Sequence, residues 1–165
     1  VLVGWRMPER TRPGRLARDL ADFILFNERT SLVARRLIDE KHLASEADSF
    51  NTDYDIGLSK LFVIPNAGVS ADTVSSEAQA AIDGFATLPD ADFQAYKAYF
   101  ATFTRERQLK TQEVTKALGR AWAYDGDFKT AFRDPQAVQG VTRAEVAQVI
   151  KTYYRPANRV AVVTP

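Results

Sequence analysis

The chain has 165 residues, of which 45% are hydrophobic and 26% charged, and its 22 basic residues nearly balance 21 acidic ones. A net charge of +1 gives no electrostatic support for a nucleic-acid or membrane partner, and no apolar run approaches the ~20 residues that a membrane-spanning helix needs. The absence of cysteine excludes disulfides and thiolate metal sites.

Strand-like and helical patterns alternate in the first half of the chain. Short apolar or alternating runs indicate strands, whereas apolar residues three and four positions apart indicate helices. In chain order we expect a strand at 1–5, a helix at about 16–27, a second helix from Ser31, strands at 43–50 and 56–64 joined by a polar turn at 51–55, and a helix from Ser70 to about Phe85.

Helical patterns dominate between residues 90 and 140. Asp90 is predicted to cap a helix over 93–103, whose aromatic stripe we interpret as core, with a groove for a partner as the alternative. A further helix at 111–124 is predicted to turn four residues inward: Val114, Leu118, Ala121 and Trp122. A short helix at 128–138, interrupted by Pro135, is expected to follow.

The C-terminal stretch 141–165 pairs a capped helix with a strand. Thr142 and Glu145 form a capping box, and the helix should end by residue 154 or 155 because Pro156 follows. Its predicted apolar face is Val146, Val149, Ile150 and Tyr153. The β-branched run 160–163 indicates a largely buried strand, which we expect to lie in a sheet next to or near residues 1–5.

This order of elements predicts an α+β fold, in which several helices pack on one face of an antiparallel sheet. We expect residues 1–165 to be a single domain excised from a longer multi-domain chain, since the sequence begins in a strand-like run without an initiator Met or a signal-peptide pattern.

No complete active site can be assembled from the residues of this sequence. His42 is the only histidine, and a zinc site needs three or four convergent ligands, so we interpret His42 as a surface or capping residue. Asp39, Glu40 and Glu46 could bind a cation, but a solvated charged loop explains them better. The pair Asp53 and Asp55 lacks the rest of a calcium loop.

The remaining polar residues also lack a catalytic or binding context. No G-x-S-x-G motif surrounds any of the serines considered, which are Ser31, Ser45, Ser49, Ser59, Ser70, Ser75 and Ser76. A small basic patch (Arg10, Arg12, Arg15 and Arg18) has no interleaved exposed aromatics, so it gives weak support for nucleic-acid binding. We therefore predict no catalytic and no metal-binding residues in this segment.

Five segments, in order, resemble the carboxy-terminal domain of a half-unit in the pitrilysin/insulinase family of zinc peptidases. They are VLVGWRMPE, RDLADFILFNERTSLVARRLIDEKHLASEADSF, DIGLSKLFVIPNAGVSADTV, LPDADFQAYKA and VTRAEVAQVIKTYYRPANRVAVVTP. The resemblance implies an α/β sandwich of the metallopeptidase half-unit type. The zinc motif of the family, H-x-x-E-H, belongs to another domain and cannot be present in a chain with one histidine.

The resemblance also implies that a substrate-gripping pair is missing. Family members often carry an Arg and a Tyr seven residues apart in the domain that faces the zinc, and the matching positions here are Ile38 and Ser45. Neither side chain can replace a guanidinium or a phenol, so we predict that this substrate-binding pair is lost. The Ser-Arg-Leu signature of the family is likewise altered, to Ser31-Leu32-Val33.

Three functions are compatible with these observations. The first is a non-catalytic, chamber-forming domain of a zinc endopeptidase, with zinc held elsewhere in the parent and a peptide substrate in the assembled enzyme. The second is a scaffold without proteolytic activity, and the third is an unrelated α+β binding module. The sequence leaves the compartment open, although a periplasmic location in a bacterium would fit the family.

The expected partners are the other domains of the parent chain, including the zinc-bearing domain. We predict an apolar surface for such a neighbour among the strand 43–50, the helix around Phe26 and the sheet edge beside residues 1–5. An exposed edge strand would also promote self-association of the isolated segment.

Overall fold

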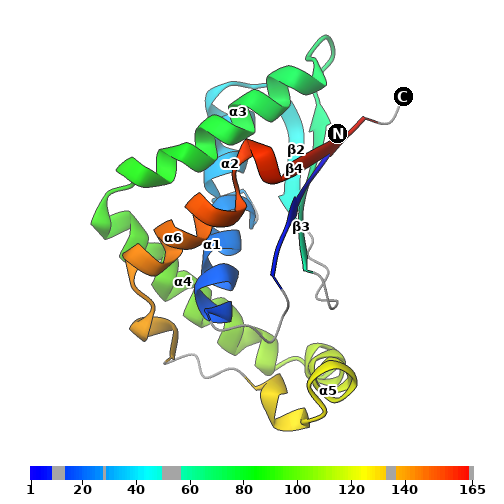
Figure 1. The fold of residues 1–165 in the computed structure, drawn as a ribbon, viewed down its shortest axis with the longest axis vertical. Coiled ribbons are helices and arrows are strands. Elements are labelled where there is room, and N and C mark those ends of the chain that lie inside the picture. The colour runs from blue at the N-terminus through cyan, green and yellow to red at the C-terminus, as the bar shows by residue number, and fades with distance from the viewer. Residues whose placement is uncertain (9–13, 28, 50–56, 133–136, 164–165) are drawn as a thin grey trace. The chain divides into compact units, whose positions relative to one another are not determined.

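The chain forms two compact units, which are described separately. Figure 1 shows the computed structural model, which describes residues 1–8, 14–27, 29–49, 57–132 and 137–163. The first unit comprises Val1–Leu88 together with Ala144–Pro165, and the second comprises Pro89–Arg143. The polar turn predicted at 51–55 lies outside the described residues.

The first unit is built on a four-stranded antiparallel sheet, as predicted. Its strands are β1 (Leu2–Arg6), β2 (Ala44–Ser49), β3 (Leu58–Pro65) and β4 (Arg159–Val162). They lie in the order β2-β3-β1-β4, so the first and last strands of the chain are neighbours. The predicted pairing of residues 160–163 with the N-terminal strand is therefore confirmed.

Helices cover one side of this sheet (Figure 1). They are α1 (Arg15–Phe26), α2 (Leu32–Ala34) with a π-helical turn at Arg35–Glu40, α3 (Ala71–Asp83) with a 3-10 turn at Gly84–Thr87, and α6 (Arg143–Tyr153), and a short 3-10 turn follows at Pro156–Asn158. Two serines act as N-caps: the Ser31 hydroxyl accepts from the Ala34 amide, and the Ser70 hydroxyl accepts from the Thr73 amide.

The core of this unit lies between the sheet and its helices. Successive residues of a strand point to opposite faces, and Val3 and Trp5 are fully buried on the helix side. The Trp5 ring stacks on Phe26 with centroids 5.2 Å apart, and Tyr154 completes the group at 5.7 Å from Trp5. These three rings join β1, α1 and the end of α6.

The prediction that residues 160–163 are largely buried is wrong. Val160 is 68% exposed and Val162 is 50% exposed, because β4 is an edge strand and the helices cover only the other face of the sheet. Leu58, Phe62 and Ile64 of β3 are exposed as well. The apolar surface of this unit is thus the outer face of β3 and β4.

Two parts of the predicted apolar surface are therefore in the wrong place. Phe26 is 1% exposed, because its ring fills the core against Trp5 and Tyr154. In the strand 43–50, the exposed residues of β2 are the polar Ser45, Glu46 and Asp48. The predicted edge beside residues 1–5 is present, since β4 pairs with β1 at the end of the sheet and carries apolar exposed side chains.

The second unit contains two helices and two short turns: α4 (Asp90–Gln108), α5 (Thr111–Asp125) and 3-10 turns at Phe128–Ala131 and Ala137–Gly140. Asp90 was expected as an N-cap, but it is the first helical residue, preceded by Pro89. At this position the negative carboxylate of Asp90 interacts favourably with the positive, N-terminal end of the helix dipole. The single short helix predicted at 128–138 is replaced by the two turns.

The aromatic stripe of α4 is partly core, as interpreted. Phe93, Tyr96 and Phe100 are buried, whereas Tyr99 is exposed. In α5, by contrast, the prediction that Trp122 turns inward is wrong, since it is 66% exposed. Ala121 is the buried residue of α5, and Trp122 lies about 100° further around the helix.

Val149 supplies a test of the α6 packing. Val149 is 9% exposed, so Val149→Ala should lower the free energy of unfolding by about 1–2 kcal/mol, through lost burial and a residual cavity. Chemical denaturation measures this loss. Val162→Ala makes the same chemical change at an exposed position and is the matched control, for which we expect a much smaller effect. Equal losses in the two variants would contradict the packing described.

Candidate functional site

Ile38 and Ser45, the two positions at which the sequence predicts that a substrate-binding pair is lost, flank the turn between the π-helical segment and β2. Ile38 is half-buried in the last turn of that segment, and Ser45 is exposed on β2. Ser45 is the extra residue of a β-bulge, because the pairing with β3 shifts between Ala44 and Glu46. The Ser45 hydroxyl donates a long hydrogen bond, 3.4 Å, to the Ile64 carbonyl.

His42 lies in the turn between these two positions. It is the one non-glycine residue with a positive φ, 53°, in the part of the chain that the structure describes. Its Nδ1 lies 3.0 Å from the Ile38 carbonyl oxygen, and the Asn66 side-chain amide donates to the His42 carbonyl at 2.8 Å. The turn is further held by the Leu43 amide, which donates to the Leu37 carbonyl at 2.7 Å.

This arrangement places His42 where a left-handed residue commonly ends a helix. With Nδ1 facing the Ile38 carbonyl, only Nε2 is left to meet other groups. A single imidazole nitrogen and one hydroxyl can form hydrogen bonds, but neither supplies the forked cationic donor of a guanidinium. The geometry agrees with a capping role for His42.

The acidic residues near this turn do not converge. Asp39 accepts from the Arg29 guanidinium at 2.8 Å, and in the neighbouring helix Glu77 pairs with Arg36 at 2.7 Å. Across the described ranges, no group of three or more His, Asp or Glu side chains is placed to hold a metal ion. The possible cation cluster of Asp39, Glu40 and Glu46 is thus not assembled.

A buried polar cluster, which the sequence did not reveal, lies between the sheet and the helices. The Ser59 hydroxyl of β3 donates to Asp22 Oδ1 of α1 at 2.6 Å, and the Tyr154 hydroxyl donates to the same oxygen at 3.1 Å. The two hydroxyl oxygens are 3.4 Å apart. All three side chains are buried. A carboxylate within the apolar face of helix 16–27 was the one signal that could have indicated this cluster.

The cluster is suited to structure rather than catalysis. Ser59 is 2% exposed, so a substrate cannot reach its hydroxyl in this conformation, and the one histidine of the chain is exposed in a different turn. Burial, and after it the negative charge of Asp22, hold the pKa of Tyr154 well above its ordinary value. A neutral phenol is therefore the stable form, and it can donate to the carboxylate.

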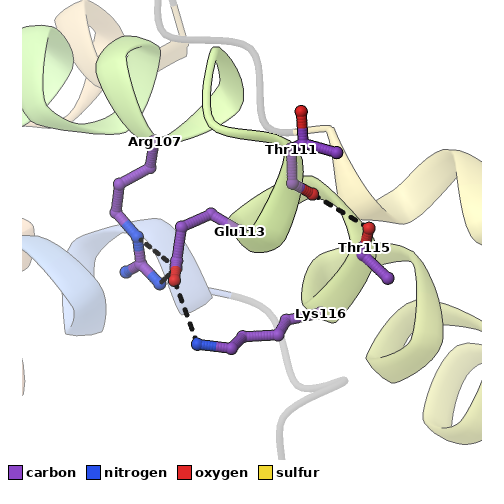
Figure 2. Close-up of polar contacts among 5 residues, drawn as sticks. All are labelled: Arg107, Thr111, Glu113, Thr115 and Lys116. Atoms are coloured by element: carbon purple, nitrogen blue, oxygen red, sulfur yellow. Dashed lines mark hydrogen bonds and ion pairs between the residues drawn. The ribbon is translucent and has the colours of Figure 1, made fainter.

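The second unit carries an exposed ionic cluster at the junction of α4 and α5, shown in Figure 2. Glu113 accepts from Arg107 and from Lys116, the latter at 3.2 Å, and these hydrogen bonds lower the pKa of Glu113, with that of Arg107 contributing most. One turn of α5 is also closed by the Thr115 hydroxyl, which donates to the Thr111 carbonyl at 2.9 Å. Exposed ion pairs of this kind contribute only about 0.2–1 kcal/mol to the free energy of folding. We therefore interpret this cluster as a structural feature of the surface.

The remaining candidate residues are dispersed. Arg15 pairs with Asp19 of its own helix at 3.7 Å and Arg18 is buried, so they do not form an exposed basic patch. The pair Asp53 and Asp55, together with Arg10 and Arg12, lies outside the described residues. Among those described, no helix is both long and apolar enough to cross a membrane.

Several solved structures have the same fold. A protease from Helicobacter pylori aligns over 96% of this chain and 39% of its own, with a TM-score of 0.83 and 17% identity. A candidate zinc protease from Bordetella pertussis Tohama I aligns over 99% of this chain and 94% of its own, with a TM-score of 0.75 and 22% identity. The inactive peptidase domain of a candidate zinc protease from Bordetella parapertussis aligns over 96% and 88%, with a TM-score of 0.77 and 21% identity.

These likenesses establish the fold. The sequence itself matches no protein-family model and no curated protein. The chain spans about two fifths of the Helicobacter protease but most of each Bordetella chain. The predicted α+β architecture is thus confirmed as the fold of an inactive peptidase domain.

The buried cluster predicts a pH-dependent stability. Because folding raises the pKa of Tyr154, its contribution is complete below the ordinary tyrosine pKa of about 10 and is lost as the pH rises above it. Tyr154→Phe should lower the free energy of unfolding at neutral pH by about 1–3 kcal/mol, because Asp22 loses a donor. It should also flatten the alkaline part of the stability profile.

Denaturant unfolding across an alkaline pH series measures both effects. Tyr153→Phe removes a neighbouring, half-buried phenol and is the matched control, which should retain the wild-type profile. If Tyr154→Phe and the wild type lose stability equally with rising pH, the coupling of Tyr154 to Asp22 is refuted.

Proposed function

We propose that this chain is a non-catalytic domain of a zinc-dependent endopeptidase, whose zinc site lies in another domain of the parent. The observation that carries the proposal is the shared fold, over 96% of this chain and 88% of the other, with the inactive peptidase domain of a candidate zinc protease. Residue types support it too, since the described residues bring together no group of three or more metal-ligating side chains.

The pitrilysin/insulinase family is the specific identity that we propose. Its support is the order of the five resembling segments, together with a fold of matching architecture. In this assignment Ile38 and Ser45 occupy the positions of the Arg/Tyr pair. The turn between them is held by the bond from the Leu43 amide to the Leu37 carbonyl and by the contact of the His42 ring with the Ile38 carbonyl. The domain would then act by enclosing a chamber rather than by gripping the peptide.

We also propose that the 165 residues form one domain of a longer chain. The support is that the chain covers 39% of the Helicobacter protease, so such proteins contain more than this segment. The partners would be the other domains of the parent, including the zinc-bearing domain, and a peptide substrate in the assembled enzyme. A periplasmic location in a bacterial parent is consistent with this family.

A zinc site does not fit the described residues of this chain. His42 turns Nδ1 to a backbone carbonyl, and its acidic neighbour Asp39 is paired with Arg29. Zinc needs three or four convergent nitrogen, sulfur or oxygen ligands. Zinc chemistry would therefore be supplied by the parent, and this chain would contribute walls and contacts.

A scaffold without proteolytic activity is the second candidate. The replacement of the Arg/Tyr pair by Ile38 and Ser45 favours it, since a parent that has lost substrate contacts could have lost activity as well. The shared fold weighs against the third possibility, an unrelated α+β module.

Deletion of this domain from the parent separates these functions. We expect the full-length parent to cleave an unstructured peptide, and the same protein without residues 1–165 to lose most of that activity while keeping its zinc. Undiminished cleavage after deletion would contradict a chamber-forming role. A full-length, zinc-loaded parent without any peptidase activity would favour the scaffold instead.

The isolated chain should bind no zinc tightly and cleave no peptide, because it lacks convergent ligands. Equilibrium dialysis at micromolar zinc measures this, and His42→Ala serves as the control for adventitious binding at the single imidazole. One zinc bound per chain at micromolar affinity, abolished in His42→Ala, would contradict the prediction.

A further inference from the structure

The two edges of the sheet differ in how well they resist pairing with another strand. An edge strand presents unpaired backbone N–H and C=O groups, and natural sheets block such edges with charges, bulges or short strands. Among the described residues, β2 pairs only with β3 and β4 pairs only with β1, so both are edges. The exposed side chains of β2 are polar or charged, whereas those of residues 160–162 in β4 are apolar.

The β2 edge is protected. Ser45 forms a bulge at its start, and a bulge twists a strand away from a prospective neighbour. Glu46 and Asp48 are exposed along the same strand. Pairing β2 with its own copy would bring these carboxylates close together in a poorly hydrated junction, which is unfavourable.

The β4 edge is short, four residues, but it has neither a bulge nor an exposed charge between residues 160 and 163. Residues 160–163 are uncharged, and Val160, Val162 and Val163 are all at least half exposed. The one charged residue of β4, Arg159, turns its guanidinium towards α3, where Nη1 donates to the Ser75 carbonyl at 3.1 Å. A second copy would therefore meet no like charge from the exposed part of this strand.

The β4 backbone is also held in position. In the turn before the strand, the Asn158 side-chain amide donates to the Arg6 carbonyl at 2.8 Å and to the Tyr153 carbonyl at 2.7 Å. These bonds fix β4 to β1 and to the end of α6. A strand that is already ordered loses little conformational entropy when it pairs.

We propose that two copies of this chain associate through β4, antiparallel and about a two-fold axis, so that their four-stranded sheets join into one continuous sheet. The inference does not depend on the proposed function. It follows from an exposed, uncharged, β-branched edge on a sheet whose other edge is blocked. Because each copy uses the same edge, the assembly closes at two chains and does not polymerise.

The outer face of the sheet supports this mode of association. Phe62, Leu2 and Val162 lie side by side across β3, β1 and β4, as the strand registers show. In the joined sheet this apolar row would continue into the equivalent row of the second copy. Val162 lies on the edge strand, so it is the residue of the row nearest to that copy. Cross-strand contacts between β-branched residues would then add to the backbone hydrogen bonds.

Size-exclusion chromatography with light scattering, from micromolar to near-millimolar chain, tests the association. We expect a concentration-dependent dimer in the wild type. Val160→Lys should weaken it by about tenfold or more, because it places an ammonium group in the strand junction of each copy. Phe62→Lys changes an exposed residue of the same face away from the edge and should retain most of the dimer.

Three results would overturn this proposal. A strict monomer at the highest concentration overturns the proposal, as does a dimer lost with Phe62→Lys but kept with Val160→Lys, which would mean that faces stack. Assemblies larger than two would overturn the closed two-fold arrangement. Circular dichroism of both lysine variants, each at an exposed position, confirms that they are folded.

Disulfide trapping locates the junction, because the chain has no cysteine of its own. Residues directly opposite in an antiparallel pair have Cβ atoms about 4.5–5.5 Å apart, close to disulfide geometry. Single cysteines at Val160, Ala161 and Val162 should give a covalent dimer under mild oxidation, with the highest yield at the two-fold axis. Asp48→Cys on β2 is the matched control, and equal trapping there would overturn the assignment to β4.

Discussion

The Asp22 carboxylate is the constraint on which the first unit depends. A buried carboxylate is tolerated only when donors satisfy it, and here one donor comes from β3 and another from the residue that follows α6. The bond from Ser59 holds α1 against the sheet, and the bond from Tyr154 holds the end of α6 next to the same carboxylate. The rings of Trp5 and Phe26 then fill the space around the phenol of Tyr154.

The position of β4 follows from this constraint. From Tyr154 a short turn leads to the edge of β1, where the Asn158 side-chain amide donates to the Arg6 carbonyl. The sheet therefore ends in a strand whose placement is set from the core side, while its outer face is left uncovered. The buried polar cluster thus lies close in the chain to the turn that leads to the exposed edge strand.

Much of the fold could be predicted from local patterns. Apolar periodicity located the helices, and the serines at 31 and 70 marked helix starts that the structure confirms. The exposure of residues 160–163 could not be predicted, because a β-branched run has the same composition in a buried strand and at an uncovered edge. In α5, Val114, Leu118 and Ala121 are half-buried or buried as predicted, and of the four predicted residues only Trp122 is exposed, because it lies about 100° around the helix from Ala121.

The candidate site was predictable only in part. Resemblance gave the positions Ile38 and Ser45, but the bulge at Ser45 and the left-handed backbone of His42 arise from hydrogen bonds to Leu37, Ile38, Ile64 and Asn66. The Asp22 cluster joins residues up to 132 positions apart, and such pairings leave no periodic trace in a single sequence.

The central position of β1 has a consequence for how the chain is made. The first strand to be synthesised pairs on one side with β3 and on the other with β4, whose residues leave the ribosome last among the strands. Until then, one side of β1 is an open template, and the ring cluster around Trp5 lacks Tyr154. Such distant pairings slow folding and lengthen the time for which apolar strands are exposed. The sheet and the ring cluster are therefore incomplete until residues 154–162 have been synthesised, and the apolar strands are exposed for that interval.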